Sequence, residues 1–162
     1  MKKGLIAVAA ILVGAYAVRI GWLVCKHSWA RPLPQVSDAV LVQMDVLMQS
    51  VSKFQAELEK TAGQAKYPGE EDKAFVDEVV RNKAVLFEVT KVNYENAKHQ
   101  RTVMAMGPFL LSVSTFATLP PEVFQSIDPK TKKLTPYVDL TALHTLESQI
   151  GEQAAALARQ IR

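Results

Sequence analysis

The chain has only one cysteine, Cys25, among its 162 residues. A single cysteine excludes an intrachain disulfide framework and any zinc site that is built from several cysteines. The three histidines, His27, His99 and His144, lie far apart in the sequence, and none belongs to a recognised metal-binding spacing. We therefore expect no metal site and no cofactor.

Sequence patterns that are typical of catalysis are also missing. The seven glycines form no phosphate-binding loop, and no serine stands in a nucleophile elbow. Carboxylates are spread over polar faces, so that no pair stands out as a general acid and base. We expect no enzymatic activity and no small-molecule substrate.

The chain has little excess of charge of either sign. Its net charge is +3, and basic and acidic residues alternate along most of its length. The densest basic stretch is Lys130-Thr131-Lys132-Lys133, which fits a solvated loop better than a binding face. Proteins that bind nucleic acids usually gather their basic residues on one face, so we expect no nucleic-acid partner.

Long hydrophobic runs are absent except for one at the N-terminus, between Gly4 and Cys25. About 20 apolar residues span a bilayer as a helix, so residues 1–25 are predicted to be a transmembrane anchor in contact with membrane lipid. Arg19 lies near the end of the run, where its side chain can reach the headgroups. The residues that define the predicted anchor are Leu5, Ile6, Ile11, Leu12, Tyr16, Arg19 and Trp22.

The same run also fits a cleaved signal peptide, with a cut after Ala17. The apolar run resumes directly after that position, which favours an uncleaved anchor. Basic residues on the two sides of the run are almost balanced, so the positive-inside rule barely decides its orientation. The Met-Lys-Lys start favours an exported, periplasmic body. Cys25 is at the membrane edge, where palmitoylation is conceivable but an unmodified thiol is favoured.

A connector with Pro32 and Pro34 over residues 26–35 precedes a predicted helical bundle domain, residues 36–162. The first helix is predicted over Val36–Thr61, with Ser37 as its N-cap. Apolar residues there recur at alternating spacings of four and three, the pattern of a coiled-coil seam. The seam residues are Val40, Met44, Leu47, Val51, Phe54 and Leu58.

A turn at residues 66–69 precedes a second long helix, predicted to start at Glu70 and to run to about Met106. Its early apolar positions are Phe75, Val76, Val79 and Val80. We expect the seam of this helix to continue through Val85, Val89, Val92, Asn96, His99, Val103 and Met106. The two polar members, Asn96 and His99, would fix the register of the bundle.

Pro108 is expected to end or kink that helix, and a short apolar segment follows it. The segment would be a buried cap or a short interfacial helix, and it is our candidate for a partner or lipid patch. The patch residues are Phe109, Leu110, Leu111, Val113 and Phe116.

The remainder is predicted as a loop with a short helix over Leu119–Phe124, a surface loop over Asp128–Val138 and a third long helix over Leu140–Ile161. No stretch alternates with a period of two over strand length. The predicted fold is therefore all-α: an N-terminal transmembrane helix followed by an antiparallel bundle of three long helices with a short apolar helix.

Several motifs occur in a recognisable order. They are the Met-Lys-Lys start, Tyr67-Pro68, Phe75, Tyr94-Glu95-Asn96-Ala97, Pro108 and Pro121-Glu122-Val123-Phe124. In this respect, over the N-terminus and residues 67–124, the chain resembles the LemA family of membrane-anchored helical bundles. It departs from that family at Glu95, where the family has Asn, and at Gly107, where it has Phe. The resemblance implies a bundle on a membrane tether without an established enzymatic activity.

The sequence thus predicts a single-pass, membrane-anchored helical scaffold or interaction protein. Its partners would be membrane lipid and another protein or a second copy of itself. The alternative is an accessory structural subunit of a larger membrane assembly, such as a respiratory, secretion or virion complex, in which the long helices pack on other chains.

Overall fold

The computed structural model of the chain describes residues 34–127 and 133–161. The chain divides into two compact units, Met1–Pro34 and Gln35–Arg162, and the described helices and strands all lie in the second. The predicted anchor, Cys25 and Pro32 lie outside the described residues. Of the helices within residues 34–127 and 133–161, none combines the length and the apolar character that crossing a membrane requires.

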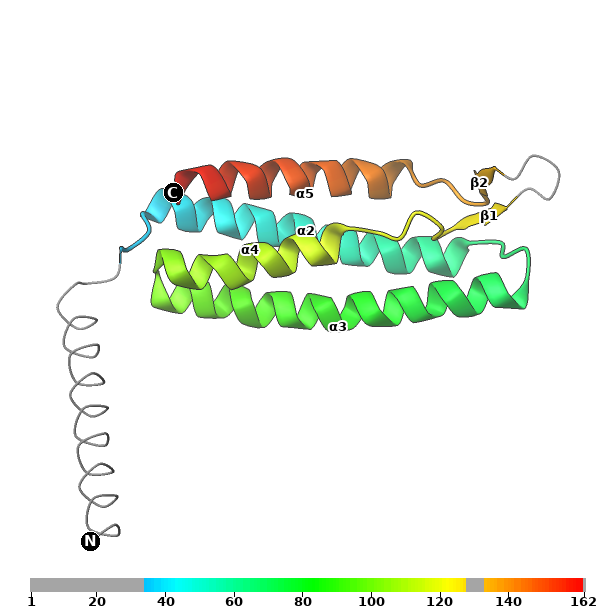
Figure 1. The fold of residues 1–162 in the computed structure, drawn as a ribbon, viewed down its shortest axis with the longest axis horizontal. Helices are drawn as coiled ribbons and strands as arrows, with labels where there is room; N and C mark the ends of the chain where they lie inside the picture. Colours follow the sequence, from blue (N-terminus) through cyan, green and yellow to red (C-terminus); the bar gives the residue numbers. More distant parts are fainter. Residues whose placement is uncertain (1–33, 128–132, 162) are drawn as a thin grey trace, which may run out of the picture. The chain divides into compact units, whose positions relative to one another are not determined.

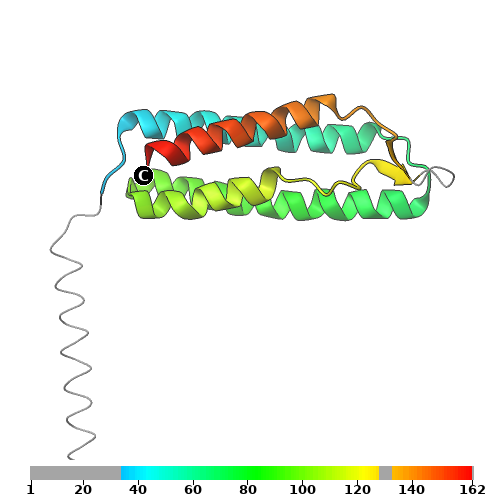
Figure 2. The same cartoon turned by 45° about the horizontal axis from the view of Figure 1, so that its top comes forward.

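Four helices form an antiparallel bundle in the described part of the second unit (Figure 1). They are α2 (Asp38–Gln64), α3 (Glu70–Gln100), α4 (Val103–Ala117) and α5 (Thr141–Gln160). Helices α2 and α5 make one layer and α3 and α4 the other (Figure 2), and α2 also packs on α3 and α4 on α5. The prediction of a mainly helical bundle is confirmed.

Helix α2 forms because a capping residue precedes a single continuous apolar stripe. Ser37 has an extended backbone, and its hydroxyl oxygen accepts a hydrogen bond from the Val40 backbone N–H at 3.4 Å. The stripe faces the other three helices and supplies much of the core. Its buried members include Val40, Met44, Leu47, Val51, Phe54 and Leu58, each exposed by 5% or less.

The second predicted helix is divided in two. Helix α3 ends at Gln100, because Arg101 adopts a left-handed backbone with φ of 53°, and α4 begins after the N-cap Thr102. The Arg101 carbonyl accepts a hydrogen bond from the Val36 N–H at 2.9 Å, which ties this turn to the start of α2. Pro108 lies inside α4 rather than ending a helix. Its missing N–H leaves the Met104 carbonyl without its usual intrahelical partner.

A small antiparallel hairpin corrects the prediction of an unstructured loop after α4. Strand β1 (Gln125–Ile127) pairs with β2 (Leu134–Pro136), and the short helix expected before it is a turn. Phe124 holds a left-handed backbone with φ of 59° and is fully buried. Its ring lies 6.4 Å from that of Tyr137, whose ring lies 5.9 Å from that of Tyr67. These aromatic contacts close one end of the bundle.

Helix α5 begins where a carboxylate organises its first turn. Asp139 accepts hydrogen bonds from the backbone N–H of Thr141 at 2.9 Å and from its hydroxyl at 2.7 Å. These two bonds lower the pKa of the Asp139 carboxyl. Leu143, Ile150 and Leu157 are the buried face that α5 turns toward the core.

Candidate functional site on the outer face of helix α3

Helix α3 buries Val76 and Val79 as predicted, but after Val79 its buried stripe differs from the predicted one. Its buried residues are Val76, Val79, Lys83, Thr90 and Ala97. Three valines predicted to continue the seam point away from the core: Val85 is 61% exposed, Val89 45% and Val92 67%. Met106, which was predicted for the same seam, is fully buried in α4. Asn96 and His99 are exposed as well, so they do not fix the register of this bundle.

The rotation of α3 about its axis decides which residues are buried, and it follows from the contacts that its aromatic side chains make. Phe87 and Tyr94 belong to the buried side, where the Phe87 ring lies 5.9 Å from Phe116 and the Tyr94 ring lies 5.9 Å from Phe109. Aromatic rings bury more apolar surface than valine does. The core therefore takes the aromatic stripe and leaves the valines outside.

Val85, Val89 and Val92 together form what we call the valine face. The spacings of four and three place all three side chains on one side of α3. Arg81, Ala84, Glu88 and Asn93 flank them, and the set forms a shallow, open depression on α3 alone. Single exposed apolar residues are ordinary on protein surfaces, but an aligned group with a charged margin is a candidate binding surface.

Helix α4 has little of the partner or lipid patch predicted for it. Phe109, Val113 and Phe116 are fully buried and Leu110 is half-buried, so these residues belong to the core. This agrees with the alternative of a buried segment and corrects the prediction of a partner or lipid patch. Leu111 is the exposed member, at 70%. The burial follows from the antiparallel packing of α4 on α3, which turns the phenylalanine side of α4 inward.

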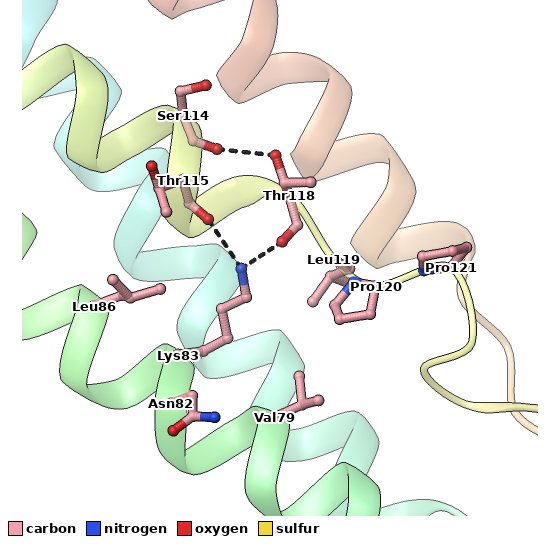
Figure 3. A pocket seen from close by; sticks show the side chains of 10 residues that line it. All are labelled: Val79, Asn82, Lys83, Leu86, Ser114, Thr115, Thr118, Leu119, Pro120 and Pro121. Atoms are coloured by element: carbon pink, nitrogen blue, oxygen red, sulfur yellow. Dashed lines mark hydrogen bonds between the residues drawn. The ribbon is translucent and has the colours of Figure 1, made fainter.

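A second depression lies beside the C-terminal end of α4 (Figure 3). It has a volume of about 660 Å³ and is lined mainly by α3 and by the segment from Ser114 to Pro121. Lys83 reaches into it from α3 and is only 6% exposed. The Lys83 ammonium donates hydrogen bonds to the carbonyl oxygens of Thr115 at 3.1 Å and Phe116 at 2.7 Å, and to that of Thr118.

These contacts make Lys83 a C-terminal cap of α4. The last carbonyls of a helix lack intrahelical partners and carry partial negative charge, which a cation offsets. Burial lowers the pKa of the Lys83 amine, and the charge of Glu147 opposes that shift. An ammonium has three N–H donors, and three carbonyls accept them. The side chain is thus engaged in holding α4 against α3 rather than presented to a ligand.

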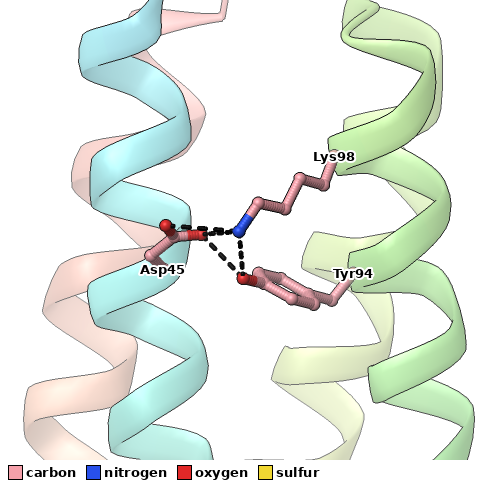
Figure 4. Close-up of polar contacts among 3 residues, drawn as sticks. All are labelled: Asp45, Tyr94 and Lys98. Atoms are coloured by element: carbon pink, nitrogen blue, oxygen red, sulfur yellow. Dashed lines mark hydrogen bonds and ion pairs between the residues drawn. The ribbon is translucent and has the colours of Figure 1, made fainter.

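A polar cluster of Asp45, Tyr94 and Lys98 joins α2 to α3 (Figure 4). The Tyr94 hydroxyl donates to an Asp45 carboxylate oxygen at 2.7 Å, and the Lys98 ammonium lies 3.2 Å from the same oxygen and 3.0 Å from the Tyr94 oxygen. Burial is the main cause of the raised pKa of Tyr94, while the hydrogen bond with Tyr94 is the main cause of the raised pKa of Lys98. The cluster fixes the α2–α3 alignment.

Within the described part of the chain, no three His, Cys, Asp or Glu side chains are grouped as metal ligands. Comparison of the chain with known protein families, with curated proteins and with solved structures finds no match. The valine face is therefore assessed from its own geometry. The sequence pattern singled out Val85, Val89 and Val92 but predicted that they would be buried in the core.

Proposed function

We propose that the chain is a single-pass, membrane-anchored helical interaction protein whose bundle binds a partner protein through the valine face. The observation that supports this most strongly is the outward alignment of Val85, Val89 and Val92 on the longest helix. Burying a valine side chain stabilises by roughly 1.5–3 kcal/mol, so these three residues offer a partner substantial apolar contact.

The charge around the valine face favours a protein over a lipid surface. Binding to anionic headgroups relies on clustered Lys and Arg. The margin of the valine face instead carries both Arg81 and Glu88, so that both signs of charge are present. Mixed charge of this kind suits the polar rim of a protein interface.

The predicted anchor over residues 1–25 supplies the second part of the proposal. Tethering restricts the bundle to a surface and so raises the effective concentration of anything else that is attached there. A partner that contacts only a few exposed valines can then be bound productively. The resemblance of residues 67–124 to the LemA family points in the same direction and stays a prediction.

The alternative function is that of an accessory subunit of a larger membrane assembly. It requires long helices that pack on other chains. In the described residues α2 packs on α5 and on α3, so the long helices bury their main stripes against each other. This self-contained core supports an interaction module over a subunit that depends on neighbours to fold.

Co-purification from solubilised membranes tests the proposal with a matched pair of variants. Val85→Asp places a charge on the valine face, and Val42→Asp places one on α2, at a residue that is equally exposed at 61%. We expect the wild-type chain and Val42→Asp to retain the same accompanying protein or additional copies of the chain, and Val85→Asp to lose them. Equal recovery with both variants would refute the valine face as the binding surface.

A further inference from the structure

We infer that the occupant of the valine face is a second copy of this chain, with α3 of one copy lying antiparallel to α3 of the other. This inference rests on the proposed function and names its partner. It follows from the symmetry of the apolar residues and from the order of the charges beside them.

The apolar residues are self-complementary. In an antiparallel helix pair with heptad-type packing, apolar residues that recur at alternating spacings of three and four on one helix lie opposite the corresponding residues of the other helix. A two-fold axis that passes α3 near residue 87 puts Val85 of one copy against Val89 of the other, and it does so twice. The same axis sets Val92 opposite Asn82 of the other copy, so the matched apolar contact is limited to Val85 and Val89 at the middle of the helix.

The charges beside the stripe are self-complementary as well. Arg81, Glu88 and Glu95 recur at intervals of seven residues, so they lie on one flank of the valine face, and all three are exposed. In the antiparallel pair the same flank of each helix meets its counterpart. Arg81 then lies near Glu95 of the second copy, and the reverse contact follows by symmetry. The two Glu88 side chains meet near the axis, so two contacts between opposite charges stand against one between like charges.

The contacts within one copy leave this pairing open. Among residues 34–127 and 133–161, neither Arg81 nor Glu95 is in an ion pair, and Glu88 holds only an exposed pair with Lys91 at 3.1 Å. Such surface pairs contribute little, and Arg81 and Glu95 are the residues that can pair across the interface. A parallel pair would instead set this flank against the opposite flank of the second copy, where Leu86 and Asn93 offer no charge to Arg81, Glu88 or Glu95, so the antiparallel pair is favoured.

The interface is narrow, so the dimer should be weak in solution and should be favoured when two copies share a membrane. Small interfaces belong to the transient class of protein complexes. Attachment to a common surface raises the effective concentration of the second copy. The inference therefore predicts an association that depends on protein concentration rather than a permanent dimer.

Two charge variants with complementary faces give the decisive experiment. Arg81→Glu makes the flank wholly acidic, and the double variant Glu88→Arg with Glu95→Arg makes it wholly basic. The full chain is studied in density-matched detergent by sedimentation equilibrium. We expect the wild type to dimerise, each variant alone to associate roughly tenfold or more weakly because like charges meet, and an equimolar mixture of the two to recover the association.

Circular dichroism of each variant checks that the exposed substitutions leave the bundle folded. A mixture that associates no better than its components would overturn the inference, as would a wild type that stays monomeric at all concentrations. If the wild type is monomeric while Val85→Asp still loses a different co-purifying protein, only the homodimer is refuted and the proposed function stands. If Val85→Asp loses nothing, both are refuted.

Discussion

The hydroxyl of Tyr94 on α3 donates a hydrogen bond to the carboxylate of Asp45 on α2, 49 residues earlier in the chain, at 2.7 Å. This bond spans the boundary between the two layers of the bundle. It fixes the rotation of α3 that turns Phe87 and Tyr94 toward α4 and the valines toward the outside. The exposure of the valine face therefore depends on the same geometry that this polar contact holds.

Replacing Tyr94 with Phe should remove the bond and keep the ring in the core. We expect a loss of about 1.5 kcal/mol in the free energy of unfolding, the lower end of the range for a hydrogen bond to a charged group, because Asp45 is partly exposed. Urea denaturation measures it. In an Asp45→Asn background the same substitution should cost less, because the charged acceptor is gone. Identical losses in both backgrounds would show that the two residues are not coupled.

Replacing Lys83 with Met should destabilise the bundle, although methionine is similar in length to lysine and suits a buried position. The substitution leaves the carbonyls of Thr115, Phe116 and Thr118 without their donor. We expect a loss of about 1–3 kcal/mol, read from urea denaturation. Lys91→Met, at an exposed site on the same helix, is the control and should stay within about 0.5 kcal/mol of wild type. Equal effects of the two substitutions would contradict the capping role.

The pKa of Asp139 gives a pH dependence with a defined sign. Its folded-state pKa lies below the ordinary value of 3.8 because Thr141 donates two hydrogen bonds to the carboxylate. The Asp139 carboxylate therefore binds a proton more readily in the unfolded chain than in the folded one. Its contribution to the free energy of unfolding is present above pH 3.8 and is lost as the pH falls through the folded-state pKa.

Urea denaturation at a series of acid pH values tests this with two variants. The stability difference between the wild type and Asp139→Ala should shrink as the pH falls below 3.8. The difference between Asp139→Asn and Asp139→Ala should stay constant, because the amide oxygen can accept a hydrogen bond but does not titrate in this range. If the stability difference between the wild type and Asp139→Ala grew as the pH fell, the predicted sign of the pH dependence would be wrong.

Deleting residues 4–24 tests the predicted anchor. The full chain should sediment with membranes and the shortened chain should remain in the supernatant after carbonate extraction, because the deletion removes the only long apolar run. Shortened chain that still pellets with protein-free liposomes would indicate that the bundle itself binds lipid. Combining the deletion with Val85→Asp would then show whether the valine face is responsible.

Helix α2 was predictable because its sequence offers one apolar stripe and one capping residue. Ser37 marks where the helix starts, and the regular spacing from Val40 to Leu58 marks the side that is buried. The local preference of the sequence and its packing in the bundle therefore favour the same helix. The start of α3 was predictable for a similar reason, since Glu70, Glu71 and Asp72 follow a Tyr-Pro-Gly turn.

The rotation of α3 was not predictable from spacing alone, because two stripes on this helix share the same rhythm. The buried stripe includes Lys83 and Thr90, which rank low on any hydropathy scale, whereas the exposed one includes three valines. Lys83 is buried because its ammonium meets the end of α4, more than 30 residues away in sequence. The aromatic residues Phe87 and Tyr94 were the signal in the sequence that could have identified the core side.

The end of α3 and the hairpin were missed for local reasons. Arg101 takes a left-handed backbone without being Gly or Asn, so no residue type marks the turn. Each strand of the hairpin has three residues, too few to establish an alternating pattern.

Site-specific photocrosslinking in intact membranes tests the central claim most directly. A photoreactive phenylalanine analogue is placed at Val89 on α3 or at Val46 on α2, two residues that are equally exposed at 45%. The valine-face account predicts a discrete crosslinked protein product from position 89, at twice the mass of the chain if the occupant is a second copy, and none from position 46. Absence of a product at position 89, or the same product from both positions, would contradict it.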